Sequence, residues 1–175
     1  MLYRPQNSYI NLRKPNVGKL IRFLISSCEP SFIQDITKIV KLYILNNPQD
    51  FLIYESGESN GKKILKALRA YAPIQDDKSI TEDLMELIKN NYYKNDKVVF
   101  IKLFKYLIEI WKEQIDFENV YNTFTAIAKN PAPSLSEEIV KCCEIFKNII
   151  KEQPQYQYLL KNIDAIQNQI YKKSE

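Results

Sequence analysis

Apolar residues recur along most of the chain with the three- and four-residue spacing of amphipathic helices. The pattern begins near Val17 and is interrupted by proline and helix-capping residues rather than by glycine. Between the interruptions it predicts about seven to eight helices and no extended sheet. We therefore expect an all-α fold, either an irregular helical bundle or a short solenoid of stacked helix pairs.

Two helices are predicted at the start of this pattern. The first begins at Val17, and its expected core stripe consists of Leu20, Phe23, Leu24 and Cys28. The second follows Pro30, where Ser31 and Gln34 fit a capping box that satisfies free backbone amides. Its expected core stripe consists of Ile33, Ile36, Val40, Tyr43 and Ile44.

The segment that follows is less regular. The apolar run 51–54 fits either a helical turn or a strand, and 56–61 is expected to be a flexible loop. A helix is predicted over 62–72, where Pro73 stops it. A second capping box, formed by Ser79 and Glu82, opens the next helix.

The segment from Lys97 to Gln114, capped by Asp96, is predicted to be the longest helix and the centre of the domain. Its apolar residues cover nearly the whole circumference, and a helix of this kind is packed by neighbours on most sides. The charged residues form one narrow stripe: Lys102, Lys105, Glu109 and Lys112.

Three further helices complete the expected domain. Asp116 caps one, Ser136 opens another after the proline-rich break 130–133, and Pro154 starts the last. The residues expected to face inward from them are Val120, Phe124, Ile127, Ile139, Val140, Cys143, Phe146, Ile149, Ile150, Tyr158, Leu159, Ile163, Ile166 and Ile170. The predicted organisation is an extended basic arm over 1–16, one helical domain over 17–171 and a frayed tail over 172–175.

The helix-start signals recur with a regular spacing. Ser79, Asp116 and Pro154 are 37 and 38 residues apart, and the segments 109–112 and 144–147 both read Glu-Ile-aromatic-Lys. In unit length and helix-pair form, residues 31–170 resemble armadillo or HEAT repeats. That resemblance implies a ridged surface for protein partners, whereas an irregular bundle with helices of similar length is the alternative.

A second resemblance rests on three short segments. The run Ile64-Leu65-Lys66-Ala67-Leu68, the pair Ile80-Thr81 and the run 107–112 occur in the same order in the N-terminal helical domain of transcription elongation factor S-II. The small-residue-rich turn that precedes the third helix of that family is missing here. The resemblance implies a nuclear helical domain that binds disordered peptides, which is the alternative function.

The composition removes several classes of chemistry. The chain contains no histidine, so mechanisms and metal sites that depend on imidazole are excluded. The three cysteines, Cys28, Cys142 and Cys143, are an odd number and two are adjacent, which indicates reduced thiols in an intracellular compartment. No catalytic residue, metal ligand or cofactor site is predicted. The abundance of Ile, Lys, Asn and Tyr indicates an AT-rich source genome.

Three local patterns have both a chemical and a structural interpretation. The segment Ser56–Lys63 resembles a damaged Walker A loop, which would make the chain a nucleotide-binding enzyme, but a solvated loop before a helix explains it better. An acidic cluster, Asp76, Asp77, Glu82 and Asp83, fits helix-start charges better than a metal site. Cys142–Cys143 fits core packing better than nucleophilic catalysis, because no histidine accompanies it.

The main functional signal is the basic arm. Residues 1–28 contain five bases and no acid, whereas the remaining 147 residues have 20 bases and 21 acids. Three of the four arginines lie in that segment, and arginine makes planar contacts to carboxylates that lysine cannot make. The candidate partner-binding residues are Arg4, Arg13, Lys14, Lys19 and Arg22.

These observations predict a non-enzymatic helical scaffold or adaptor, a structural subunit of a larger protein assembly. We expect an acidic protein surface as the partner of the arm rather than nucleic acid, since the body of the chain is not basic. No segment is long and apolar enough to span a membrane. The expected location is intracellular, in the cytoplasm or cytoskeleton, with the nucleus and the mitochondrion as alternatives.

Overall fold

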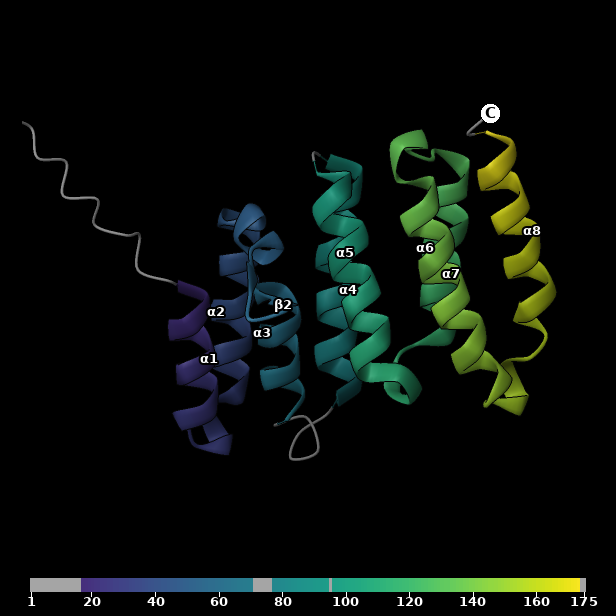
Figure 1. Ribbon diagram of the computed structural model, residues 1–175. Coiled ribbons are helices and arrows are strands. Elements are labelled where there is room, and N and C mark those ends of the chain that lie inside the picture. Colours follow the sequence, from purple (N-terminus) through teal and green to yellow (C-terminus); the bar gives the residue numbers. More distant parts are fainter. Residues whose placement is uncertain (1–16, 71–76, 95, 174–175) are drawn as a thin grey trace, which may run out of the picture.

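The computed structural model describes residues 17–70, 77–94 and 96–173. The helices of these residues are α1 (Val17–Ser27), α2 (Ile33–Asn46), α3 (Asn60–Arg69), α4 (Asp77–Lys94), α5 (Lys97–Trp111), α6 (Phe117–Lys129), α7 (Ser136–Lys151) and α8 (Leu159–Lys172) (Figure 1). Within the described residues, the strands are β1 (Tyr54–Glu55) and β2 (Glu58–Ser59), which pair as one short antiparallel hairpin. The all-α prediction is confirmed.

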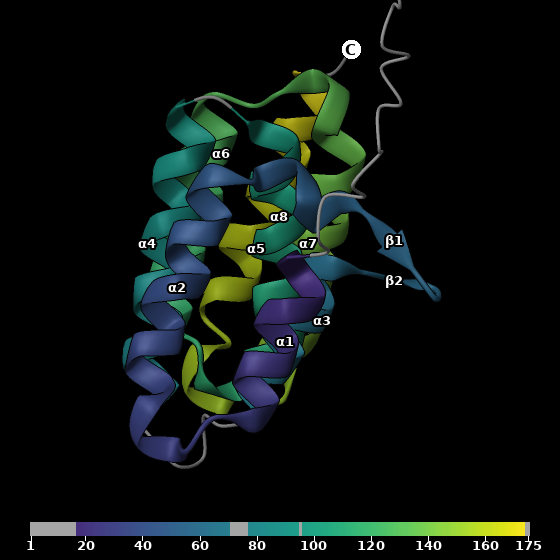
Figure 2. The ribbon, with the colours of Figure 1, turned by 90° about the vertical axis from the view of Figure 1, so that its left-hand side faces the viewer.

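The helices lie in two layers. In one layer, α1 packs against α3, α3 against α5 and α5 against α7; in the other, α2 contacts α4 and α6 contacts α8. Figure 2 views the stack from the α1–α2 end, with α2, α4 and α6 on one side and α1, α3, α5 and α7 on the other. Of the three regularly spaced start signals in the sequence, Asp116 caps α6, Pro154 begins η6 ahead of α8, and Ser79 lies within α4. The described helices are therefore stacked in layers, and their grouping into repeated pairs stays a prediction.

Proline determines where most of the short 3-10 segments begin. Four of them begin with proline, whose fixed φ and missing N–H suit the first turn of a helix. The 3-10 segments are η1 (Pro30–Phe32), η2 (Pro48–Leu52), η4 (Lys112–Gln114), η5 (Pro133–Leu135) and η6 (Pro154–Tyr156). The ambiguous run 51–54 divides between η2 and β1, so both of its predicted conformations occur.

Carboxylates and a hydroxyl fix the starts of three helices. Asp96 accepts a hydrogen bond from the backbone N–H of Val99 at 3.1 Å, and Asp116 accepts one from Asn119 at 3.0 Å. Both caps were predicted, because a short side chain with an acceptor oxygen satisfies a free amide of the first turn. Ser59 caps α3 in the same way through Lys62, at 3.2 Å.

Helix α5 occupies the centre of the molecule, as predicted. It contacts α3, α4 and α7, and most of its apolar side chains are buried. The Phe104 ring is fully buried, with its centroid 5.5 Å from that of Phe100 and 5.0 Å from that of Phe124 on α6. This aromatic contact joins the two layers.

The predicted orientation of α1 is wrong. Ile21 and Ile25 form its buried face, whereas Leu20 and Phe23 are exposed and Leu24 is partly exposed. Both faces of α1 are apolar, so hydrophobicity alone did not indicate which one packs against α3. Contact with α3 selects the isoleucine face and leaves Leu20, Phe23 and Leu24 outside it, whereas Cys28 of the predicted stripe is partly buried against the core. On α2, four of the five predicted core residues are buried: Ile33, Ile36, Val40 and Tyr43. The side chain of the fifth, Ile44, is not among those that the structure describes.

Two predicted capping boxes do not form. Residues 30–32 make the 3-10 turn η1, so α2 begins at Ile33 with Phe32 as its N-cap and no side-chain cap. Helix α4 begins at Asp77, which places Ser79 inside the helix rather than at its N-cap. Ser31 is therefore part of a 3-10 turn, and Ser79 comes after α4 has already begun.

Several element boundaries and the orientation of one side chain also differ from the predictions. The expected flexible loop 56–61 contains β2 and the first residues of α3, and α3 ends at Arg69 rather than at residue 72. Helix α4, with 18 residues, is longer than α5, with 15, because η4 ends α5 at Trp111. Tyr158 precedes α8 and is exposed rather than inward. Helix α8 continues to Lys172, and the predicted arm 1–16 lies outside the described residues.

Phe104→Ala should destabilise the fold by about 3–5 kcal/mol, because it leaves a cavity between the two layers that neighbouring rings cannot fill. Urea unfolding followed by circular dichroism measures the loss. The control is Val98→Ala on the same helix, where the side chain is 40% exposed and the cost should stay below about 1 kcal/mol. Equal costs for the two variants would contradict the central position of α5.

Candidate protein-interaction surface

The first helix pair presents an apolar surface to solvent. On α1, the side of the helix turned away from α3 bears exposed leucine and phenylalanine side chains, and Phe23 is 65% exposed. On α2, the exposed side bears isoleucine and leucine, and Leu42 is 59% exposed. We name this surface the end face and define it by Leu20, Phe23, Leu24, Ile39, Leu42 and Leu45.

The two ends of the stack differ in polarity. Helix α8 packs against α6 and α7, and its outer side carries polar and charged residues; Tyr171 is its one large exposed apolar residue in the described chain. The exposed polar residues of α8 are Lys161, Asn162, Asp164, Asn168, Gln169 and Lys172. A terminal helix pair of a stack needs a polar outer side to stay soluble by itself. The α8 end meets this requirement, and the end face does not.

Basic residues accompany the end face. Residues 17–46 contain four bases and two acids, and α1 itself carries Lys19 and Arg22 without an acid. Of the bases on α2, Lys38 pairs with Asp35 at 3.2 Å and Lys41 pairs with Asp83 of α4 at 2.5 Å. The helix pair therefore carries two more bases than acids, and both lysines of α2 are paired with acids of the chain.

The five predicted partner-binding residues divide into two groups. Lys19 and Arg22 lie on α1; Lys19 is exposed, and the Arg22 guanidinium donates a hydrogen bond to the Gly18 carbonyl at 3.4 Å. These two residues are thus placed on the same helix as half of the end face. The other three, Arg4, Arg13 and Lys14, lie outside the described residues.

The Ser56–Lys63 segment forms a hairpin and a helix start. Ser56 and Gly57 have positive φ angles at the turn, and the backbone N–H of Lys62 donates to Ser59 rather than facing an open loop. Lys62 Nζ lies 3.3 Å from Glu109 Oε2 on α5, and Lys66 pairs with Glu58. This ion pair with Lys66 lowers the pKa of the Glu58 carboxyl.

A polar pocket of about 370 Å³ lies between this hairpin and α5. Two tyrosines, Tyr54 and Tyr106, line it together with bases and acids in equal number: Lys62, Lys105, Glu58 and Glu109. A Walker A loop instead connects a buried strand to a helix and leaves its amides and lysine for phosphate. The described residues contain no parallel sheet behind this loop, and the amide and ammonium of Lys62 already have protein partners.

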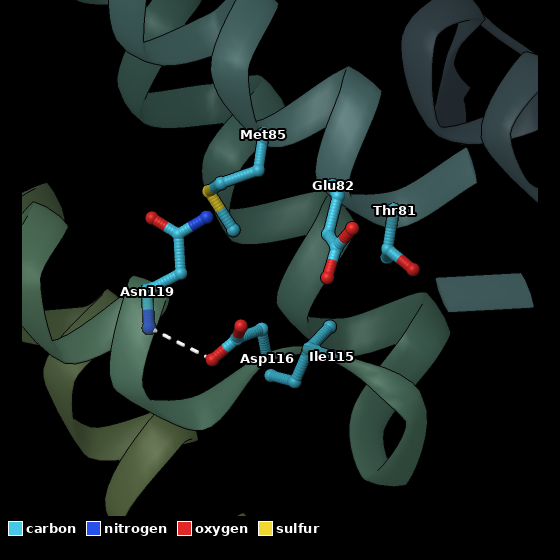
Figure 3. A pocket seen from close by; sticks show the side chains of 6 residues that line it. All are labelled: Thr81, Glu82, Met85, Ile115, Asp116 and Asn119. Carbon is cyan, nitrogen blue, oxygen red and sulfur yellow. Dashed lines mark hydrogen bonds between the residues drawn. The ribbon is translucent and has the colours of Figure 1, made fainter. Parts of the chain in front are cut away.

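Of the four acids noted in the sequence, the side chains of Glu82 and Asp83 are described, and they have different neighbours. Figure 3 shows Glu82 on α4 across a small pocket from Asp116 and Asn119 of the α6 start. This pocket has a volume of about 10 Å³, room for at most one water, and Asp116 is used as a cap. Asp83 pairs with Lys41 on the other side of α4. Asp76 lies outside the described residues, among which no group of three potential metal-ligating residues occurs.

The adjacent cysteines are part of the core. Cys142 and Cys143 are fully buried on α7, and the Cys142 thiol lies 3.9 Å from the Ile101 carbonyl oxygen. Burial raises the pKa of the Cys142 thiol to about 12 and raises the pKa of the Cys143 thiol further. A neutral buried thiol is a poor nucleophile, which agrees with the packing interpretation.

Sequence analysis did not identify the end face as exposed. The sequence nevertheless contained an indication of it. Helices α1 and α2 each carry apolar residues on two sides, whereas a helix that is exposed to water on its outer side carries them on one side only. No helix in the described ranges is long and apolar enough to cross a membrane. Comparisons with family models, curated proteins and solved structures find no match to this chain. The two family resemblances therefore stay predictions.

The buried thiols should not react in the folded protein. In a titration with Ellman's reagent at pH 8, we expect fast reaction of the partly exposed Cys28 and slow reaction of Cys142 and Cys143, whose pKa values are raised by burial. Denaturant should release all three thiols. The control is Cys28→Ser, which should remove the fast phase; a fast phase that persists in this variant would contradict the burial of α7.

Proposed function

We propose that the chain is a non-enzymatic helical scaffold or adaptor, a structural subunit that docks into a larger protein assembly through its end face. The observation that carries the proposal is the difference between the two ends of the stack. One end is covered by polar residues of α8, whereas the other exposes six large apolar side chains over two helices. Apolar residues that stay exposed in the isolated chain become stabilising when another protein covers them.

The size of the end face supports docking of a protein. Six large apolar side chains on two helices, each about half exposed, are comparable to the largest apolar patches found on monomers, roughly 300–600 Å². One partner contributes about 800 Å² to a standard interface, so these side chains are enough for the apolar part of such a contact. The polar rim of an interface accounts for the rest.

The basic arm supplies a second contact in this proposal. Helix α1 begins at Val17, so residues 1–16 directly precede in the sequence the helix that bears half of the end face. Arg4, Arg13 and Lys14 would extend the positive charge that Lys19 and Arg22 place on α1. An acidic surface on the partner is the chemistry that this charge selects.

Phe23→Glu should release the chain from its assembly, because it places a charge where an apolar contact forms. The measurement is the mass of the native complex in extracts of the source cells, with cross-links from Lys19 and Lys38 to neighbouring proteins read by mass spectrometry. Tyr171→Glu is the matched control, since Tyr171 is 54% exposed at the opposite end. Retention of the large complex and of the same cross-links by Phe23→Glu would refute the proposed function.

Deletion of residues 1–16 should weaken the assembly without unfolding the body. The arm adds charge contacts, and losing three bases reduces a salt-sensitive attraction. The deletion variant should elute from the complex at lower salt than the full chain and still melt in one cooperative transition. Unchanged salt resistance would remove the arm from the proposal and leave the end face.

A further inference from the structure

The geometry points to a binding site apart from the end face: the polar pocket between the β1–β2 hairpin and α5 binds a small, hydroxyl-rich molecule that carries one anionic group. The pocket has a volume of about 370 Å³, which is in the size range of protein sites for small molecules. The anionic group, a phosphate or a carboxylate, is held by Lys105. This inference is independent of the proposed function, because the pocket and the end face share no residue.

One lysine of the pocket lacks a counter-ion. Lys62 Nζ lies 3.3 Å from Glu109 Oε2, and Glu58 pairs with Lys66, so both carboxylates that line the pocket are neutralised. Lys105 also lines the pocket and is partly buried, and among the described residues it has no ion pair and no hydrogen bond. Partial burial of an ammonium without a counter-ion is unfavourable. One negative charge on a ligand would therefore complete the charge balance of this pocket.

Hydroxyl groups form much of the remaining lining. Tyr54, Ser56 and Ser59 come from the hairpin, which projects from the stack (Figure 2), and Tyr106 comes from α5. Hydrogen bonds join the Tyr106 hydroxyl to those of Ser59 and Tyr54, so the two walls of the pocket are connected. A hydroxyl can both donate to the oxygens of an anion and accept from a hydroxyl of the same ligand. This lining fits a molecule with several hydroxyl groups better than an apolar one.

Two other classes of ligand fit this pocket less well. A nucleoside triphosphate carries several negative charges, and the single free ammonium of Lys105 cannot balance them. A divalent cation takes its ligands from carboxylates, but Glu58 and Glu109 are both paired with lysines. The described residues also contain no group of three potential metal-ligating side chains. A small ligand with one anionic group is the class that remains.

Three matched probes test the ligand class on the full-length chain. Glucose 6-phosphate carries the phosphate, gluconate carries a carboxylate, and glucose has similar hydroxyl groups without charge. NMR titration measures the three Kd values from the backbone amide shifts of Gly57 and Tyr106. At least one charged probe should bind roughly tenfold more tightly than glucose, as expected for one charge-assisted contact. The probe that binds more tightly identifies the anionic group as phosphate or carboxylate.

Three substitutions on α5 test the role of Lys105. Lys105→Gln removes the free ammonium and should weaken binding of the charged probe roughly tenfold. Glu109→Gln removes the carboxylate that neutralises Lys62, so this variant should bind the same probe more tightly than the unmodified chain. Lys102→Gln is the matched control and should leave the Kd unchanged. Lys102 also lies on α5 without an ion pair in the described chain, but it does not line the pocket.

Several results would overturn the inference. If orthophosphate binds as tightly as glucose 6-phosphate, the pocket holds an adventitious ion only. If Lys102→Gln weakens binding as much as Lys105→Gln, the probes respond to the overall charge of α5 and not to the pocket. Failure of both charged probes to bind, or equal binding of glucose, also refutes it. Circular dichroism melting checks that each variant is folded, and the mass of the native complex tests the proposed function separately.

Discussion

The packing of α5 between its neighbours is the contact on which the rest of the structure depends. Phe100, Phe104 and Trp111 are each fully buried on this helix, and Phe104 meets Phe124 of α6 edge to face at 5.0 Å. Through α3 and α7 the same helix joins the first helices of the stack to the last. Because its apolar residues cover nearly all sides, it cannot be placed at the surface of any compact arrangement. The two layers are therefore assembled around it.

A stack built in this way has two ends, and in this chain the two ends differ in polarity. The α8 end is covered mostly by its own polar residues, such as Lys161 and Asn168. The α1–α2 end continues the apolar surface found between pairs inside the stack, with Phe23 and Leu42 outermost. Exposed apolar side chains on two neighbouring helices mark a surface suited to contact with another protein, which connects the architecture to the proposed role in assembly.

Three side chains that also had a chemical interpretation have structural roles in the described residues. Asp116 caps α6, Lys62 pairs with Glu109, and Cys142 lies in the core. Each of these groups had an alternative interpretation as part of a reactive site. The partners of these three groups account for their positions in the fold.

The sequence alone determined the fold class, the central helix and the caps at Asp96 and Asp116, since these depend on local spacing and on the first turn of each helix. It did not determine which side of α1 is buried. Leu20 and Phe23 are as apolar as Ile21 and Ile25, so the hydrophobic pattern of this helix fits two orientations equally well. Only contact with α3 chooses between them, because that contact requires side chains whose shape fits a surface formed by residues 40 positions further along the chain. The end face is the side that this choice left uncovered, which is why the tertiary structure was needed to find it.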